Sequence, residues 1–356
     1  MKLRYSRLKV FHHTDRLLAL PRSCDEIKAP VNIRIKPTNV CNHNCRYCAY
    51  RVSDLQLGKD MVESDHLPRE MMLEIIDDAA AMGVEAFTFS GGGEPFCYPY
   101  FEEALSRLAG TDIQFAALTN GTRLRGDAAT IFRERGTWVR ISIDGWDGPS
   151  YAAYRGVSEK AFAKVIDNIE SFSKSDRQCY LGTAIVVDEM NASHVYALSR
   201  LLKESGADSV KISPVIVSNS GEATNAYHRE LAPRVRDEIA RIRGDLVSDG
   251  FELFDSYHMQ LESFEKAYDW CPYIQLCPVI GANGALYSCH DKAYNDDTGR
   301  IGDLGRAGLK TAWFARKSRF FEIDPSRDCN HHCVVDGANK MILEYLDIDT
   351  EHSNFI

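Results

Sequence analysis

The sequence lacks a long apolar run, an excess of basic residues and any internal repeat. No window approaches the roughly 18 uninterrupted apolar residues of a membrane-spanning helix, and charges scattered through the N-terminus leave no apolar stretch for a signal peptide. The formal net charge is −9, which argues against a general surface for nucleic acids or anionic membranes. These absences predict a cytoplasmic protein that binds neither nucleic acid nor membrane.

Cysteine is the residue type that stands out. The chain of 356 residues has 11 cysteines, of which Cys24, Cys97 and Cys179 stand alone and are expected to be buried small apolar residues. The others form two clusters, which are Cys41, Cys45 and Cys48 near the start and Cys271, Cys277, Cys289, Cys329 and Cys333 near the end. In a reducing compartment, such clusters indicate metal ligation before disulfides.

Between residues 31 and 215, short β-rich runs alternate with amphipathic helical stretches, a pattern typical of a parallel sheet with crossover helices. Helices are predicted from Pro68 to just before Gly83, over about 158–173, and over 226–249, the last one long and charged. The candidate strands are 31–36, 84–89, 113–118, 138–143, 180–187 and 209–215.

A closed eight-unit barrel needs more units than these, so the pattern predicts an α/β fold with a partial (β/α)6 barrel of parallel strands. From residue 271 the sequence becomes turn-rich. We therefore divide the chain into an N-terminal extension (1–30), the partial barrel (31–250) and a small cysteine-rich α+β module (251–356).

The first cysteine cluster has the spacing C-x₃-C-x₂-C and follows the first candidate strand. Three thiolates on one loop can hold three irons of a cubane [4Fe–4S] cluster and leave the fourth iron without a protein ligand. A zinc site completed by His43, or a set of unligated thiols, is the alternative.

The segment Cys41-Asn-His-Asn-Cys45-Arg-Tyr47-Cys48, with an aromatic residue just before the third cysteine, resembles the signature of the radical SAM (S-adenosylmethionine) superfamily. The resemblance covers roughly residues 31–215. It implies that the open iron of a [4Fe–4S] cluster binds the amino and carboxylate groups of SAM. An electron from the cluster would then split SAM into methionine and a 5′-deoxyadenosyl radical.

A second segment, Phe89-Ser-Gly-Gly-Gly-Glu94-Pro95, follows the second candidate strand as the family's Gly-Gly-Glu-Pro motif does. Glycines let a backbone approach a ligand closely, and Glu94 can accept hydrogen bonds from an ammonium group. By order along the chain, Ser142 resembles the family's contact to the SAM ribose and Arg155 the arginine that pairs with the SAM carboxylate. The predicted SAM-binding residues are Tyr47, Gly91, Gly92, Gly93, Glu94, Ser142, Arg155 and Val215.

The second cluster contains the spacing C-x₁₂-G-x₄-C, from Cys271 through Gly284 to Cys289. Residues 279–289 are typical of a β-hairpin with Asn283-Gly284 at its turn. The arrangement resembles the auxiliary-cluster modules called SPASM and twitch. It implies one auxiliary [4Fe–4S] cluster held by Cys271, Cys289, Cys329 and Cys333.

Three features of this second region leave alternatives open. The further C-x₂-C-x₅-C segment of a full SPASM module is missing, which is why we predict one auxiliary cluster. Cys277 is surplus, and is either an alternative ligand or a catalytic thiol. His290, His331 and His332 allow a zinc site, because thiolates with imidazoles also satisfy Zn²⁺.

The resemblance predicts an enzyme that abstracts a hydrogen atom from its substrate and receives electrons from a reductant such as flavodoxin or ferredoxin. Two-electron oxidation of a small polar molecule, such as a sugar or aminocyclitol, is the leading hypothesis. Peptide modification of the sulfatase-maturing or thioether-forming kind is an alternative. Another is epimerisation, in which Cys97 or Cys277 returns a hydrogen. Outside this class, the chain would be a non-catalytic iron–sulfur or zinc-binding protein.

Overall fold

A single mixed sheet organises the computed structural model, which describes residues 4–52, 57–174, 176–258, 264–352 and 355. In this part of the chain the strand order is β10-β9-β8-β1-β2-β3-β4-β5-β6-β7. Strands β1 to β7 are parallel, and each pairs with the next. The strands are β1 (Asn32–Ile35), β2 (Ala86–Phe89), β3 (Gln114–Thr119), β4 (Trp138–Ser142), β5 (Tyr180–Val187), β6 (Ser209–Pro214), β7 (Glu252–Asp255), β8 (Val279–Ile280), β9 (Ala285–Tyr287) and β10 (Arg300–Asp303).

The partial barrel of parallel strands is confirmed. All six predicted strands are present, and the structure adds β7, which the sequence did not predict because its four residues, Glu-Leu-Phe-Asp, are too few and too polar at the ends to show a period. Strand β7 lies beyond the predicted domain boundary at residue 250, yet it pairs with β6 of the barrel. The division into domains therefore stays a prediction.

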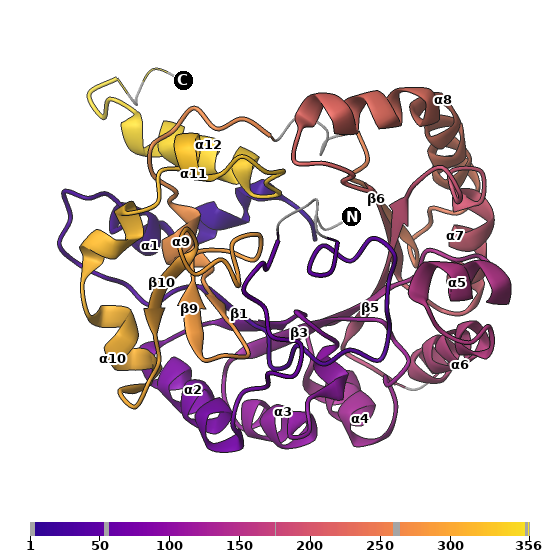
Figure 1. Cartoon of the computed structure of the whole chain (residues 1–356), viewed down its shortest axis with the longest axis horizontal. Helices are drawn as coiled ribbons and strands as arrows, with labels where there is room; N and C mark the ends of the chain where they lie inside the picture. Colours follow the sequence, from indigo (N-terminus) through magenta and orange to yellow (C-terminus); the bar gives the residue numbers. More distant parts are fainter. Residues whose placement is uncertain (1–3, 53–56, 175, 259–263, 353–354, 356) are drawn as a thin grey trace.

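Helices cover the outer face of the parallel strands, as Figure 1 shows. Helix α2 begins after Pro68 and ends at Gly83, which has a left-handed φ of 81°. This matches the predicted ends. The long charged helix starts earlier than predicted, at Gly221. The helices of this layer are α2 (Arg69–Met82), α3 (Phe101–Ala109), α4 (Gly126–Arg135), α5 (Gly148–Arg155), α6 (Lys160–Lys174), α7 (Val195–Glu204) and α8 (Gly221–Asp245). No described helix has the length and apolar character needed to cross a membrane.

The cysteine-rich region continues the sheet of the barrel. Strand β8 pairs in parallel with β1, and β9 returns antiparallel to β8 through a turn in which Gly284 has a φ of 73°. The Asn283-Gly284 hairpin is thus confirmed. The other elements of this region are α9 (Tyr273–Leu276), α10 (Gly308–Phe314), η4 (Lys317–Phe321), α11 (Pro325–Asp328) and α12 (Asp336–Asp347).

The chain start lies across the middle of the barrel in Figure 1. It contains η1 (Arg7–His12) and is followed by α1 (Thr14–Leu18). Arg4 forms an ion pair with Glu252 of β7 at 2.8 Å, and the ring of Tyr5 lies 3.9 Å from that of Phe254. We call residues 4–10 the N-terminal strap, because they are held against the barrel strands.

Trp313 tests whether the cysteine-rich region and the barrel unfold as one unit. Its side chain is fully buried in the main core, and its indole N–H donates to the carbonyl of Lys28 at 2.8 Å. We expect Trp313→Ala to cost about 3–5 kcal/mol of unfolding free energy. The neighbouring Phe314→Ala, at an exposed position, is the control and should change little.

Urea unfolding followed by circular dichroism and by tryptophan fluorescence measures this. The two signals should change together in one transition that Trp313→Ala moves to lower urea concentration. Two transitions, of which the substitution shifts only one, would show that the regions are independent units.

Candidate active site

The first cysteine cluster lies on the loop that leaves the carboxyl end of β1. Backbone bonds from Asn44 to the carbonyl of Arg155 (2.8 Å) and from Arg46 to that of Tyr154 (3.1 Å) tie this loop to α5. Its thiols are half-buried and reduced. Burial raises the pKa of Cys41 to about 12, with Glu94 and Cys45 adding to the increase, and Cys45 likewise adds to the raised pKa of Cys48.

Because Cys45 contributes to both increases, the three thiols lie near one another, and the thiolates of Cys41 and Cys48 are unfavourable without a compensating cation. An iron–sulfur cluster supplies such positive charge, so the residues fit it. Among the described residues, no three His, Cys, Asp or Glu side chains converge closely enough to hold a single metal ion.

The glycine loop after β2 packs directly against the cysteine loop. The amide of Gly93 donates to the carbonyl of Thr38 at 3.1 Å, and that of Glu94 donates to Val40 at 3.0 Å. A Cβ on Gly93 would lie 2.2 Å from the Val40 oxygen, and one on Gly92 would lie 2.1 Å from Asn39 Oδ1. In this structure, the glycines are therefore required for the close packing of the two loops. The predicted contact of Gly91, Gly92 and Gly93 with SAM stays a prediction.

The carboxylate of Glu94 is buried and already hydrogen-bonded within the chain. It accepts from Thr119 Oγ1 (2.7 Å), from the amide of Asn120 (2.7 Å) and from the amide of Phe96 (3.2 Å). Burial raises the pKa of Glu94, and these three hydrogen bonds oppose that increase. In this structure Glu94 thus holds the ends of β2 and β3 together, and its predicted contact with an ammonium group stays a prediction.

Arg155 is buried beside the cysteine loop and pairs with Asp144. One guanidinium nitrogen is 2.5 Å from Asp144 Oδ2 and another is 3.5 Å from the sulfur of Cys45. Asp144 also accepts hydrogen bonds from the Tyr47 hydroxyl and the Val186 amide. The Nε of Arg155 is buried without a partner, so the guanidinium retains a donor beside the cysteine loop.

The sequence analysis missed Asp144, which lies two residues after the end of β4. Its signal was available, because a carboxylate at the carboxyl end of a parallel strand lies at the edge where such folds place their sites. Burial raises its pKa, and Arg155 opposes this increase. Asp144 therefore links the predicted SAM residues Tyr47 and Arg155.

A cavity of about 240 Å³ brings two other predicted residues together. Tyr47 and Val215 line it from the barrel, and His331 and Val334 line it from the cysteine-rich region. Val215 is buried, and its carbonyl accepts a hydrogen bond from His228 Nε2 at 2.7 Å. Ser142 ends β4 and is partly buried.

Four thiols of the second cluster, which are distant in the sequence, lie within electrostatic range of one another. Burial raises the pKa of Cys271 to about 11, with Cys329 adding to it. Burial also raises the pKa values of Cys289 and Cys333, and in each the increase includes contributions from other thiols of the group. Asn339 Nδ2 lies 3.2 Å from the sulfur of Cys271, a contact of the kind that tunes iron–sulfur clusters.

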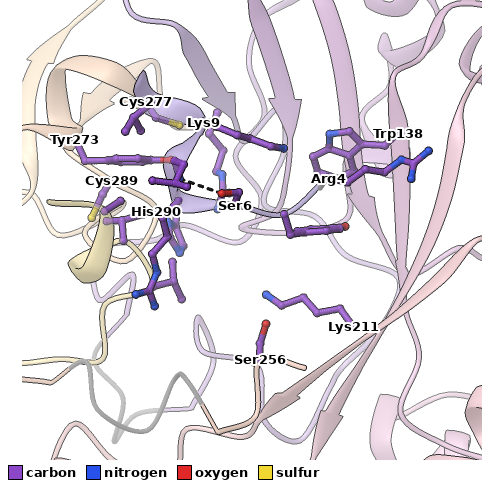
Figure 2. Close-up of a pocket in the computed structure, with 18 of the residues that line it drawn as sticks. Arg4, Ser6, Lys9, Trp138, Lys211, Ser256, Tyr273, Cys277, Cys289 and His290 are labelled. Atoms are coloured by element: carbon purple, nitrogen blue, oxygen red, sulfur yellow. Dashed lines mark hydrogen bonds between the residues drawn. The ribbon is translucent and has the colours of Figure 1, made fainter. Parts of the chain in front are cut away.

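Cys277 has different surroundings. Burial raises its pKa, whereas Arg34 and a hydrogen bond with Tyr273 lower it, and no other thiol contributes to the shift. Cys277 lines a cavity of about 880 Å³ inside the barrel together with Tyr273, Cys289 and His290, which lie along one side of the space in Figure 2. Cys97, by contrast, lies on η3 (Pro95–Cys97), with its sulfur 3.7 Å from Asn42 Oδ1, and is not among the residues of this wall.

Lys36 lies between the two thiol groups and was also missed by the sequence analysis. It follows β1, is buried, and donates to the Tyr50 hydroxyl and the Gly91 carbonyl. Burial lowers its pKa to about 7, and Arg34 adds to that decrease. Cys289 and Cys48 oppose it, which shows that one ammonium group is in electrostatic range of both thiol groups.

The fold is an α/β partial barrel in which two groups of cysteines lie near β1, and comparisons with known proteins show what it resembles. Residues 35–202 match the radical SAM superfamily. The chain is similar to two proteins named S-adenosylmethionine-dependent nucleotide dehydratase. One, from Flammeovirga pacifica, is 29% identical over 104 residues, which are 29% of this chain and 35% of that protein. The other, from Lacinutrix mariniflava, is 25% identical over 139 residues, 37% of this chain and 29% of that protein.

The aligned region thus spans about a third of these curated relatives. Among solved structures, Streptococcus suis SuiB bound to precursor peptide SuiA has a TM-score of 0.61 at 16% identity, covering 88% of this chain and 71% of SuiB. Native anSMEcpe with bound AdoMet has a TM-score of 0.59 at 18% identity, covering 89% of this chain and 96% of anSMEcpe. These likenesses show the fold.

The match identifies a radical SAM domain within residues 35–202, just under half of the chain. Such a domain implies a [4Fe–4S] cluster and SAM as cofactors, together with a reductant and a substrate.

Gly93→Ala tests the contact between the two loops. The added Cβ meets backbone atoms of Asn39 and Val40 at 2.2–2.5 Å, so the cysteine loop has to move. We expect a clear loss of iron from the first cluster after anaerobic reconstitution, measured by iron content and by 5′-deoxyadenosine formation from SAM. Gly250→Ala is the matched control, since a Cβ there meets nothing within 4 Å. Normal iron and normal SAM cleavage in Gly93→Ala would contradict the packing argument.

Proposed function

We propose that Cys41, Cys45 and Cys48 hold the cluster to which SAM binds, and that Tyr47, the glycine loop and Arg155 border the SAM site. The bound cofactors supply a 5′-deoxyadenosyl radical that removes a hydrogen atom from a substrate carbon. The chain's own contribution is to position the site. Arg155 keeps an unpartnered buried Nε beside Cys45, and Asp144 orients both Arg155 and Tyr47.

We further propose that Cys271, Cys289, Cys329 and Cys333 hold an auxiliary [4Fe–4S] cluster. Their mutual electrostatic influence supports a shared ligand, as described above. Lys292 and Lys266 oppose the raised pKa of Cys329, so the protein provides positive charge where thiolates are needed. The Asn339 amide stabilises the sulfur of Cys271 in the same way.

The reaction we favour is two-electron oxidation of a small polar substrate inside the barrel. The observation that carries this proposal is that Cys289, a proposed auxiliary ligand, lines the barrel cavity. Dehydrogenation of an alcohol carbon removes one hydrogen atom by the radical, then one electron and one proton. The auxiliary cluster would supply the electron acceptor. A site for that acceptor at the cavity wall is what such a reaction requires.

Three other reactions have specific support. Epimerisation is supported by Cys277, whose thiol lines the same cavity and is separate from the four grouped thiols. Peptide modification is supported by the fold it shares with SuiB, which was solved with a precursor peptide. Nucleotide dehydration is supported by the names of the two curated relatives, over the aligned region alone.

Cysteine substitutions separate the roles of the two clusters. We expect Cys289→Ala to lower the iron content from about eight to about four per chain, because one of two four-iron clusters is lost, while 5′-deoxyadenosine formation from SAM continues. Cys45→Ala should abolish that formation. Cys179→Ala, at a buried lone cysteine, is the control and should leave both readouts unchanged.

Iron analysis and chromatography of the SAM products measure these outcomes. About four irons in the unmodified protein, or stoichiometric zinc, would refute the auxiliary cluster. Once a substrate is in hand, Cys277→Ala distinguishes the reactions. It should spare an oxidation, whereas an epimerase that uses this thiol would lose its product.

A further inference from the structure

The cavity inside the barrel has a strongly positive lining. Its volume of about 880 Å³ falls within the usual range for sites that bind small molecules. It lies between the strands and the N-terminal strap, and its lining includes Trp138 and Tyr180, the first residues of β4 and β5. Six basic residues line it, and no Asp or Glu is among the described lining residues. The basic residues are Arg4, Arg7, Lys9, Arg34, Arg140 and Lys211.

Three of these residues come from the barrel strands themselves. Arg34 lies on β1, Arg140 on β4 and Lys211 on β6. Parallel strands covered by helices usually carry apolar side chains on both faces. Basic groups placed inside such a barrel lose part of their hydration, a cost that an anionic partner offsets.

Arg34, Arg140 and Lys211 form no ion pair with any residue in the described part of the chain. Arg4 pairs with Glu252, whereas Arg140 has a buried Nε without a hydrogen-bond partner. Burial, together with the nearby Arg140 and Arg34, lowers the pKa of Lys211 to about 8. Asp291 is in electrostatic range of Arg34 but does not line the cavity. Both arginines therefore repel Lys211 around the space that the three cations share.

Arg140 is held in place by its surroundings. Its guanidinium lies 4.7 Å from the ring centre of Tyr5 and 5.2 Å from that of Trp138. Gly182 is its register partner on β5, and a Cβ there would lie 3.8 Å from Arg140 Nε. Ring contacts and a glycine neighbour thus fix the side chain and leave room beside it. A fixed guanidinium with unused donors is suited to a phosphate, which it can bind through two parallel hydrogen bonds.

We propose that this cavity binds the phosphate groups of a small phosphorylated substrate. The proposal rests on the proposed function, which places the substrate inside the barrel. Figure 2 shows Lys9 of the strap and Lys211 of β6 entering the space from different sides. Cations that converge from the strap, β1, β4 and β6 surround a compact anion. An extended acidic peptide would instead need cations spaced along a track.

Binding to the reconstituted, SAM-loaded enzyme tests this proposal without a catalytic assay. Isothermal titration calorimetry with fructose 1,6-bisphosphate is compared with fructose, the matched uncharged probe. We expect the bisphosphate to bind and fructose not to bind. Arg140→Gln and Lys211→Met should each weaken binding about tenfold, while Lys211→Arg should retain it because the charge is kept.

The matched control is Arg200→Gln, since Arg200 lies exposed on α7 and pairs with Glu204. It should bind the bisphosphate like the unmodified enzyme. Circular dichroism and iron content show whether each variant is folded and loaded. Equal binding by all variants, or no binding of the bisphosphate by the unmodified enzyme, would overturn the proposal. Binding of hexa-aspartate in its place would assign the cavity to acidic peptides.

SAM cleavage measured on the same preparations separates the two proposals. Bisphosphate binding that depends on Arg140 and Lys211, without 5′-deoxyadenosine formation, would leave the phosphate site standing and refute the radical chemistry. SAM cleavage without such binding would refute the phosphate site alone.

Discussion

Strand β1 is the element on which both cysteine groups depend. It pairs with β2, and hence with the glycine loop, on one side and with β8 of the cysteine-rich region on the other. The loop with Cys41, Cys45 and Cys48 leaves its carboxyl end. Because backbone pairing sets strand positions to within a residue, the two thiol groups are fixed relative to each other. Lys36, at the end of β1, is in electrostatic range of both.

The side chains inside the barrel differ in polarity from those in the rest of the core. Helices α2 to α8 bury apolar side chains against the outer face of the sheet. The inner face carries Arg34, Arg140 and Lys211 around an open cavity. Such charges reduce stability when left alone, so their presence indicates that this face is organised for a ligand and not for packing.

The sequence predicted the parts of the structure that local patterns determine. Six strands, the ends of α2 and the Asn283-Gly284 hairpin follow from alternation, capping residues and turn residues. Strand β7 was missed because it is short and has no period of its own. Its place is set by pairing with β6, a contact between residues far apart in the sequence.

The candidate sites also differ in whether local sequence or contacts between distant residues determine them. The spacing within residues 41–48 is local, so the first cluster was visible. The different surroundings of Cys277 could not be predicted, because spacing alone makes it as good a ligand as Cys271. The partnership of Asp144 with Arg155 and Tyr47 joins three elements. Which basic residues face inward is likewise decided by barrel curvature, which no short segment reveals.

The N-terminal strap has a practical consequence for work with recombinant protein. Arg4 and Tyr5 are held against β7 beside the cavity, so an addition that displaces the strap would also disturb the cavity wall. Helix α12 packs against η1, and its Ala338 and Met341 line the same cavity. An affinity tag at either end of this sequence should therefore be cleaved off before ligand binding is compared.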